Sequence, residues 1–286
     1  MQMQCKWLLL LPALLMVACA SQPELGGDEP GFSIVELEQR AEMASYAGAH
    51  SDALLQYQKI LEKEPDNIAA LVGVGESLLA VNQPRRAESY FERTLKIDPV
   101  NTNAREARAL SWLMQGKSIV AKKSLDDLVD DGVERWRVWN GLGVIADLSG
   151  DYMMAVEYYQ KAIALAPNLT ILHNNLGYSQ IMAHDYVAAE ASLKKALLLG
   201  PGNARVLNNL ALCTAWQGRY DEATNILSPV IGAAAANNNT GYIAYLRKEH
   251  LLAKEFFARA MRLSPTYYKK AANNLEMVNR KLALVE

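Results

Sequence analysis

The residue types that most often carry out catalysis or bind metals are sparse in this chain. Its four histidines are His50, His173, His184 and His250. No two of them stand at the spacing of metal ligands, and none has a cysteine beside it. No serine or cysteine nucleophile has a paired base that the sequence reveals. The chain is therefore expected to be a non-enzyme with no metal, no cofactor and no small-molecule substrate.

Two glycine pairs and one acidic run allow both a chemical and a structural interpretation. The pairs Gly73–Gly75 and Gly141–Gly143 look like fragments of nucleotide-binding loops. They lack a preceding strand and occupy matching positions of predicted helices, so helix packing explains them better. The aspartates between Asp126 and Asp131 do not have the spacing of a calcium loop. That run is expected to be a solvated helix end.

A period of 34 residues dominates the sequence. Pro65 and Pro99 are 34 residues apart, and so are Pro167 and Pro201. Alanines recur in the same frame at Ala53, Ala87, Ala121, Ala155, Ala189 and Ala223. Glycines recur in it at Gly48, Gly116, Gly150 and Gly218. A fixed period of this length predicts stacked helical hairpins that share one elongated core.

The stretch between Trp139 and Pro167 shows how one unit is built. Trp139, Leu142 and Gly143 share one face of a first helix. Gly150 is placed to end that helix in the left-handed conformation, and a second helix follows. A single hairpin cannot bury its apolar face, so the unit requires copies of itself on either side.

These features resemble the tetratricopeptide repeat over residues 34–267. The residues that match its signature are Trp139, Leu142, Gly143, Ala155, Tyr159, Ala162 and Pro167. The resemblance implies an all-α fold, a right-handed α-solenoid of about seven hairpins, with a C-terminal capping helix at residues 268–286. A partner-docking helix is the alternative for that last segment. The third repeat has Val133 in place of the proline. The sixth repeat is about four residues short, so we expect a distorted turn at Ala233–Asn239.

In the family that this chain resembles, the first helix of each hairpin lines a concave groove that binds peptides. The groove residues implied here are Arg137, Asn140, Asn174, Asn175, Tyr178, Arg205, Asn208, Asn209, Trp216, Asn238, Asn239 and Tyr242. A row of amides suits an extended peptide, because each amide offers both donors and an acceptor. Arg137, Arg205 and Trp216 are expected to add a carboxylate or stacking contact. The alternative is that the asparagines bridge neighbouring helices and bind no ligand.

Residues 1–18 have the pattern of a targeting segment. The apolar run from Trp7 to Val17 is too short to span a bilayer as a permanent helix. Cys19 follows small residues in a pattern that resembles the bacterial lipobox, which implies an acylated cysteine. An ordinary secretory signal cut nearby is the alternative. The resemblance implies a lipid anchor in the periplasmic face of the Gram-negative outer membrane, and residues 19–33 are expected to be a flexible tether.

Composition limits the kinds of partner and of cross-link. The formal net charge is −2, from 29 Lys and Arg against 31 Asp and Glu. No basic face is predicted, so a nucleic-acid partner is not expected. Cys5 falls in the targeting segment and Cys19 at the lipobox. Cys213 remains, and it is expected to be a buried apolar residue rather than a disulfide partner.

A lipobox, a tether and a tetratricopeptide array together resemble bacterial envelope assembly lipoproteins. The stretch 208–229 is similar to the TadD-type lipoproteins of tight-adherence (Flp) pilus systems, and the secretin pilotins are the neighbouring candidate. The resemblance implies a protein partner, either a secretin or a pilus assembly component. The alternative function is a structural envelope lipoprotein that organises or regulates a cell-wall enzyme complex.

Overall fold

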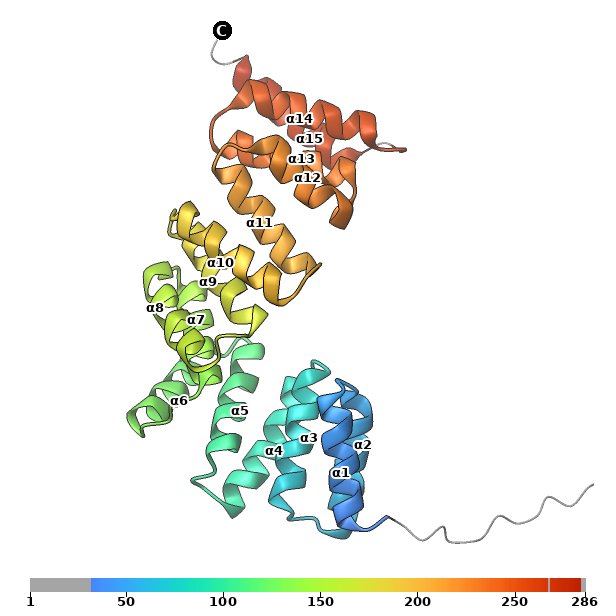
Figure 1. Ribbon diagram of the computed structural model, residues 1–286, viewed down its shortest axis with the longest axis vertical. Coiled ribbons are helices and arrows are strands. Elements are labelled where there is room, and N and C mark those ends of the chain that lie inside the picture. The colour runs from blue at the N-terminus through green and yellow to red at the C-terminus, as the bar shows by residue number, and fades with distance from the viewer. Residues whose placement is uncertain (1–31, 267, 284–286) are drawn as a thin grey trace, which may run out of the picture.

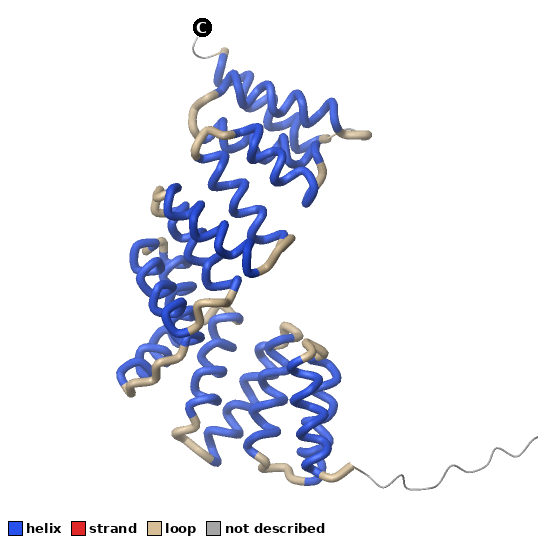
Figure 2. Tube along the Cα trace, in the orientation of Figure 1, coloured by secondary structure: helices blue, strands red, loops and turns tan. Residues whose placement is uncertain are grey.

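The computed structural model describes residues 32–266 and 268–283, and it contains no β-strand within them (Figures 1 and 2). The helices are α1 (Ile34–Tyr46), α2 (His50–Lys63), α3 (Ile68–Ala80), α4 (Pro84–Ile97), α5 (Thr102–Met114), α6 (Ser118–Asp130), α7 (Trp136–Ser149), α8 (Tyr152–Leu165), α9 (Thr170–Met182), α10 (Tyr186–Leu199), α11 (Ala204–Trp216), α12 (Tyr220–Ile231), α13 (Ala233–Leu246), α14 (His250–Leu263) and α15 (Lys269–Leu282). From α1 to α14, each odd-numbered helix forms a hairpin with the even-numbered helix that follows it. The predicted all-α repeat superhelix is confirmed.

The hairpins stack side by side into an elongated, curved array (Figure 1). The first helices of neighbouring hairpins contact each other, for example α9 with α11 and α11 with α13. Within the described residues, the backbones of second helices do not approach one another in the same way, although the Arg259 side chain of α14 forms a salt bridge with Asp221 of α12. The first helices therefore form the tighter layer, and we call its open surface the inner face. The core is a row of clusters between hairpins rather than a single centre.

The turn inside each hairpin repeats one backbone conformation. The residues at this position are Gly48, Asn82, Gly116, Gly150, His184, Gly218 and Lys248, all with φ between 58° and 80°. Gly150, with φ 80° and ψ 8°, ends α7 as predicted. The left-handed conformation costs a non-glycine residue about 1–2 kcal/mol. Three hairpins nevertheless adopt it without glycine. Asn82 and His184 are of residue types that adopt it more often than most, whereas at Lys248 the packing of the two helices imposes the turn.

Glycines inside the first helices make room for the second helices. A Cβ added to Gly75 would lie 2.3 Å from a ring carbon of Phe91. A Cβ on Gly143 would lie 2.6 Å from the ring of Tyr159. Both rings are buried in the contact between the two helices of a hairpin. The glycine pairs of the sequence therefore serve close helix packing, as their structural interpretation predicted.

The prediction of a distorted turn at Ala233–Asn239 is wrong, because this segment lies within α13. The sixth repeat is instead shortened in α12, which has 12 residues, and in the connection after it. Gly232 alone joins α12 to α13, with φ 85° and ψ 151°, whereas residues 200–203 join α10 to α11. The four alanines Ala233–Ala236 have high helix propensity, which explains why α13 begins directly after the glycine.

The last helix, α15, packs against both α13 and α14. Leu275, Val278 and Leu282 of this helix join the adjacent core cluster. The predicted signal segment, the acylation of Cys19 and most of the predicted tether lie outside the described residues. None of the helices that the structure describes combines the length and the apolar character needed to cross a membrane.

Candidate functional site

Asparagine side chains follow one another along the inner face in the C-terminal half of the array. The predicted residues are Asn140 in α7, Asn174 and Asn175 in α9, Asn208 and Asn209 in α11, and Asn238 and Asn239 in α13. The repeat places them there, because residues one period apart occupy the same position in successive first helices.

Four of these amides form a continuous chain of hydrogen bonds across three helices, which we call the central amide ladder. Asn209 Nδ2 donates to Asn174 Oδ1 at 3.0 Å, and Asn175 Nδ2 donates to Asn140 Oδ1 at 3.1 Å. Asn174 Nδ2 joins the two bonds by donating to Asn175 Oδ1 at 3.4 Å. Asn174 is only 4% exposed. These side chains therefore bridge α7, α9 and α11, which is the arrangement that the sequence left open as the alternative to peptide binding.

A second set of amides, the terminal amide ladder, joins α13 to α15. Asn274 Nδ2 donates to Asn238 Oδ1 at 2.9 Å, and Asn238 Nδ2 donates to Asn239 Oδ1 at 3.3 Å. Asn274 is absent from the predicted groove residues. The sequence does carry a signal for it, since Asn273–Asn274 repeats the paired asparagines of the preceding first helices. The last helix therefore extends the inner face.

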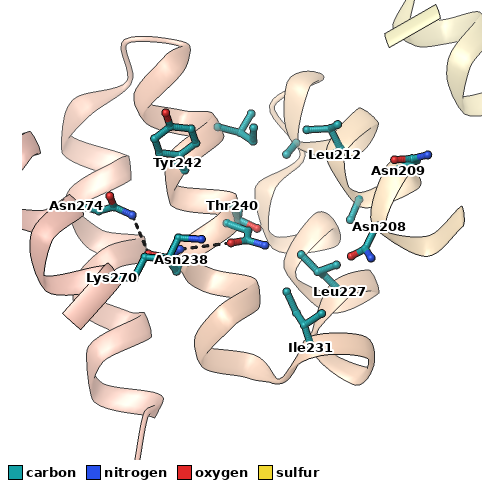
Figure 3. Close-up of a pocket in the computed structure, with 14 residues that line it drawn as sticks. Asn208, Asn209, Leu212, Leu227, Ile231, Asn238, Thr240, Tyr242, Lys270 and Asn274 are labelled. Carbon is teal, nitrogen blue, oxygen red and sulfur yellow. Dashed lines mark hydrogen bonds between the residues drawn. The ribbon is translucent and has the colours of Figure 1, made fainter. Parts of the chain in front are cut away.

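The two ladders are interrupted between α11 and α13. Within the residues that the structure describes, no hydrogen bond joins an asparagine side chain of α11 to one of α13. A cavity of ≈ 780 Å³, which we call the gap pocket, opens at this interruption, and Figure 3 shows residues that line it. Its lining includes Asn208, Asn209, Leu212, Leu227, Ile231, Asn239, Tyr242 and Lys270. Predicted groove residues thus meet residues of α12 and α15 that the sequence analysis missed.

Two predicted tyrosines add exposed aromatic surface. Tyr242 lines the gap pocket and is 44% exposed. Its ring stacks on that of Tyr245, with centroids 6.3 Å apart and an angle of 26° between the planes. Tyr178 of α9 is also exposed, and desolvation raises the pKa of its hydroxyl. The Tyr178 hydroxyl therefore remains a neutral hydrogen-bonding group near neutral pH.

Arg137 was expected to offer its guanidinium to a ligand, but the structure pairs it with carboxylates of the chain. Its Nη1 lies 2.8 Å from Glu76 Oε1, and its Nε lies 2.9 Å from Glu106 Oε1. The three residues, on α3, α5 and α7, form what we call the ionic tie. Burial raises the pKa of Glu106, which is 2% exposed, although Arg137 and Arg135 oppose this effect. Counting back 34 residues from Asn140 gives Glu106, so the repeat frame itself points to this residue.

The remaining two predicted residues lie apart from the gap pocket. Trp216 stacks on Tyr186, with ring centroids 6.1 Å apart and planes 5° apart, in the contact between α10 and α11. It therefore packs within the chain instead of offering a stacking face to a ligand. Arg205 is exposed at the start of α11 and lines a smaller hollow of ≈ 490 Å³ together with Asn174.

The N-terminal half of the inner face contains a hollow of different chemistry. Its volume is ≈ 850 Å³, and Glu38, Glu42, Glu76, His50 and Tyr57 contribute to its lining. The sequence analysis assigned none of these residues to the groove. Carboxylates therefore predominate among the charged groups of this hollow, in contrast to the amides farther along the chain.

The other polar residues of interest have partners within the chain. Asp126 pairs with Lys122 and Asp131 with Arg105, each at 2.6 Å. Asp147 accepts hydrogen bonds from Tyr159 and Ser179 in the contact between α7, α8 and α9. The buried Cys213 thiol donates to a backbone carbonyl at 3.2 Å, as its predicted structural role implies. Within the described residues there is no cluster of three His, Cys, Asp or Glu side chains suited to a metal.

Comparison with protein families identifies the repeat. Two family models, both described as "Tetratricopeptide repeat", match the chain. One covers residues 136–169, and the other covers residues 45–110 and 180–239. Together they account for more than half of the 286 residues.

Two curated proteins are similar to parts of the chain. Tetratricopeptide repeat protein 6 of Homo sapiens is 29% identical over 132 residues, which cover 45% of this chain and 25% of that protein. The probable UDP-N-acetylglucosamine–peptide N-acetylglucosaminyltransferase SPINDLY of Hordeum vulgare is 28% identical over 134 residues, covering 44% of this chain and 14% of that protein. The chain thus matches a quarter or less of the length of either relative.

Solved structures share the fold over most of the chain. The structure of the APC/C hetero-tetramer Cut9–Hcn1 aligns with a TM-score of 0.63 and 21% identity, covering 86% of this chain and 48% of that one. The structure of Pseudomonas aeruginosa pilF aligns with a TM-score of 0.56 and 18% identity, covering 75% of this chain and 97% of that one. At these identities the likeness establishes the fold alone.

Proposed function

The chain belongs to the tetratricopeptide repeat family, and from this premise we propose that it is a scaffold that holds an extended segment of a partner protein against its inner face. The gap pocket carries this proposal. Most amides of the central ladder are paired with one another, so they are not the groups that a ligand meets first. At the gap, the exposed Asn208 and Asn239 stand beside an exposed tyrosine and an open cavity. Amides with spare donors and acceptors suit a peptide backbone.

We further propose that the scaffold works at the bacterial envelope, anchored through an acylated Cys19 in the periplasmic face of the outer membrane. There it would assist assembly of a pilus or secretion system, either as a tight-adherence (Flp) component or in the manner of a secretin pilotin. The lipobox-like residues before Cys19 and the glycine- and proline-rich segment after it support the anchor. The resemblance of residues 208–229 to TadD-type lipoproteins supports the pilus role.

One observation favours the second candidate, a lipoprotein that organises or regulates a cell-wall enzyme complex through another surface. Large apolar residues are exposed around the turns inside the third, fourth and fifth hairpins. They include Met114, Ile119, Leu148, Met153 and Val187. The same register is occupied in three consecutive hairpins, so these residues follow one edge of the array rather than the inner face.

Photo-crosslinking in living cells separates the two candidates. A benzoylphenylalanine replaces Tyr242 or Tyr178 on the inner face, or Met153 at a turn, and the captured protein is identified by mass spectrometry. We expect a secretin or pilus component to be captured from Tyr242. Capture of a cell-wall enzyme from Met153, with none from the two tyrosines, would favour the second candidate.

The proposed anchor has its own test. Labelled palmitate should be incorporated into the wild-type chain, and the product should fractionate with the outer membrane. A Cys19→Ser variant should incorporate no label and be released as a periplasmic or unprocessed form. The Cys213→Ser variant is the matched control, because it removes the other cysteine beyond the targeting segment and should leave labelling unchanged. Equal labelling of wild type and Cys19→Ser would refute the anchor.

A further inference from the structure

The gap pocket lies beside the shortened sixth repeat. In that repeat α12 ends at Ile231, and only Gly232 connects it to α13. Asn209 pairs backward with Asn174, whereas Asn238 pairs forward with Asn274. The pocket therefore lies between two amide ladders that do not meet.

The gap pocket is lined by both apolar and polar side chains. Leu212 comes from α11, Leu227 and Ile231 from α12, and Ile243 from α13. Asn208, Tyr242 and Lys270 also border the pocket, as the side chains in Figure 3 show. Its ≈ 780 Å³ falls within the range of about 300–1,000 Å³ that is typical of ligand pockets. Such a space admits a bulky side chain together with its main chain.

The charge beside the gap pocket limits which side chains of a partner can bind there. Lys270, in the first turn of α15, is the only charged residue among those that line the gap pocket. Its ammonium group attracts a nearby carboxylate and disfavours a nearby cation. The N-terminal hollow of the same face, lined by Glu38, Glu42 and Glu76, has the opposite preference. Of these two hollows, only the gap pocket is lined by a lysine or arginine.

We infer that the gap pocket selects the bound segment: it takes a bulky aliphatic or aromatic side chain of an extended partner polypeptide, with an aspartate or glutamate nearby that approaches Lys270. This inference rests on the proposed function and names the chemistry of its partner. The exposed Asn208 and Asn239 contact the main chain of the partner segment, which is the same for any sequence. The pocket therefore determines which residue of the segment binds at this position. Burial of the apolar side chain provides most of the affinity.

Peptide selection tests the inference. Random 12-residue peptides displayed on phage are selected against the immobilised full chain, and the enriched peptides are synthesised with fluorescein for anisotropy titrations. We expect the enriched sequences to combine a Leu, Ile, Met or Phe with a nearby acidic residue. Ile231→Trp and Leu212→Trp, which fill the pocket from two helices, should each weaken binding about tenfold or more.

Two matched controls isolate the pocket. Leu251→Trp adds the same bulk at an exposed position of α14 that does not line the pocket, and it should leave affinity unchanged. Lys270→Glu should weaken the acidic peptides about three- to fivefold. The same change at the adjacent Lys269, which does not line the pocket, should have less than half that effect on affinity. Circular dichroism verifies that every variant is folded.

The outcomes distinguish this inference from the proposed function. Enrichment of basic peptides, a library without binders, or binders that tolerate both tryptophan variants would overturn the pocket assignment. If such tolerant binders crosslink to Tyr178, the inner face still binds protein and the proposed function stands. If the partner captured in cells is crosslinked only from Met153, the proposed function fails whatever the peptides show.

Discussion

The two halves of the inner face connect their first helices by different chemistry. From α3 to α7 the connection is ionic, through Glu76, Glu106 and Arg137. From α7 to α11 it consists of neutral amides. Glu106 and Asn140 stand 34 residues apart in the same frame. The same position of the repeat therefore holds the carboxylate of an ion pair in one half and a hydrogen-bonded amide in the other.

The difference shows what each side chain requires of its neighbours. A buried carboxylate needs a cation, and desolvation of both groups offsets much of their attraction. A buried amide needs only another amide, because each carries both donors and an acceptor. Paired amides can therefore be repeated from helix to helix, whereas the ionic connection needs a cation on one helix as well as carboxylates on others.

The largest expected effect comes from removing the cation of the ionic tie. Arg137→Ala leaves the buried Glu106 without its closest partner, which should lower the free energy of unfolding by about 3 kcal/mol. This is at the low end for buried pairs because Arg137 is 31% exposed and Arg135 remains nearby. Urea denaturation measures the loss, and Arg135→Ala is the control expected to lose less. A loss below 1 kcal/mol for Arg137→Ala would contradict the tie.

A smaller effect is expected from the central amide ladder. Asn174→Ala removes a buried side chain that pairs with Asn209 and Asn175, and it should cost about 1–3 kcal/mol. Asn208→Ala, one period later and exposed, should change stability by less than about 0.5 kcal/mol. Hydrogen exchange of α9 and α11 and urea denaturation measure both variants. Equal losses would mean that the ladder does not distinguish these two positions.

The ionic tie should also respond to pH in a way that the ladder does not. Burial raises the pKa of Glu106 above its ordinary value of 4.5, so between those two values the folded chain binds more protons than the unfolded chain. The contribution of Glu106 to the free energy of unfolding therefore falls as pH rises through that window, by at most about 1.4 kcal/mol per pH unit. Glu106→Gln should remove this slope, while Asn174→Ala should retain it. An unchanged slope in Glu106→Gln would show that Glu106 titrates normally.

The smallest expected effect is on salt dependence. Raising NaCl from 0.05 to 0.5 M should reduce the cost of Arg137→Ala by less than about 1 kcal/mol, because the Arg137–Glu76 pair is partly exposed and screened. The cost of Asn174→Ala should not change, since its hydrogen bonds are between neutral groups. The pair of variants is compared by urea denaturation at both salt concentrations. A salt effect of equal size in both variants would contradict an ionic connection at Arg137 and a neutral one at Asn174.

The sequence predicted the fold well because the pattern of one helical hairpin recurs in every repeat. Gly150 and its equivalents mark the turns, although Asn82, His184 and Lys248 show that the same turn also forms without glycine. The error at Ala233–Asn239 has a local cause. The sequence analysis placed the missing residues just before the repeat frame resumes. That segment is helical because its alanines have high helix propensity, and the missing residues are lost from α12 and the connection after it.

The candidate site was predictable as a set of positions but not as a set of contacts. The frame located the asparagines on one face, yet only the structure shows that Asn174 pairs with Asn209 and Asn238 with Asn274. Arg137 was assigned to a ligand because it lies on the groove face, and its partner Glu76, 61 residues away in the chain, was not recognised. The gap pocket lies where the two ladders are interrupted, and its lining on α12 and α15 could not be predicted from the pattern of the first helices.

Hydrogen exchange on the full chain, with and without the tightest peptide selected on it, tests the central claim most directly. The account predicts slower amide exchange on binding in α11, α13 and the first half of α15, around the gap pocket. Slower exchange confined to α1–α5, or to the even-numbered helices, would contradict it.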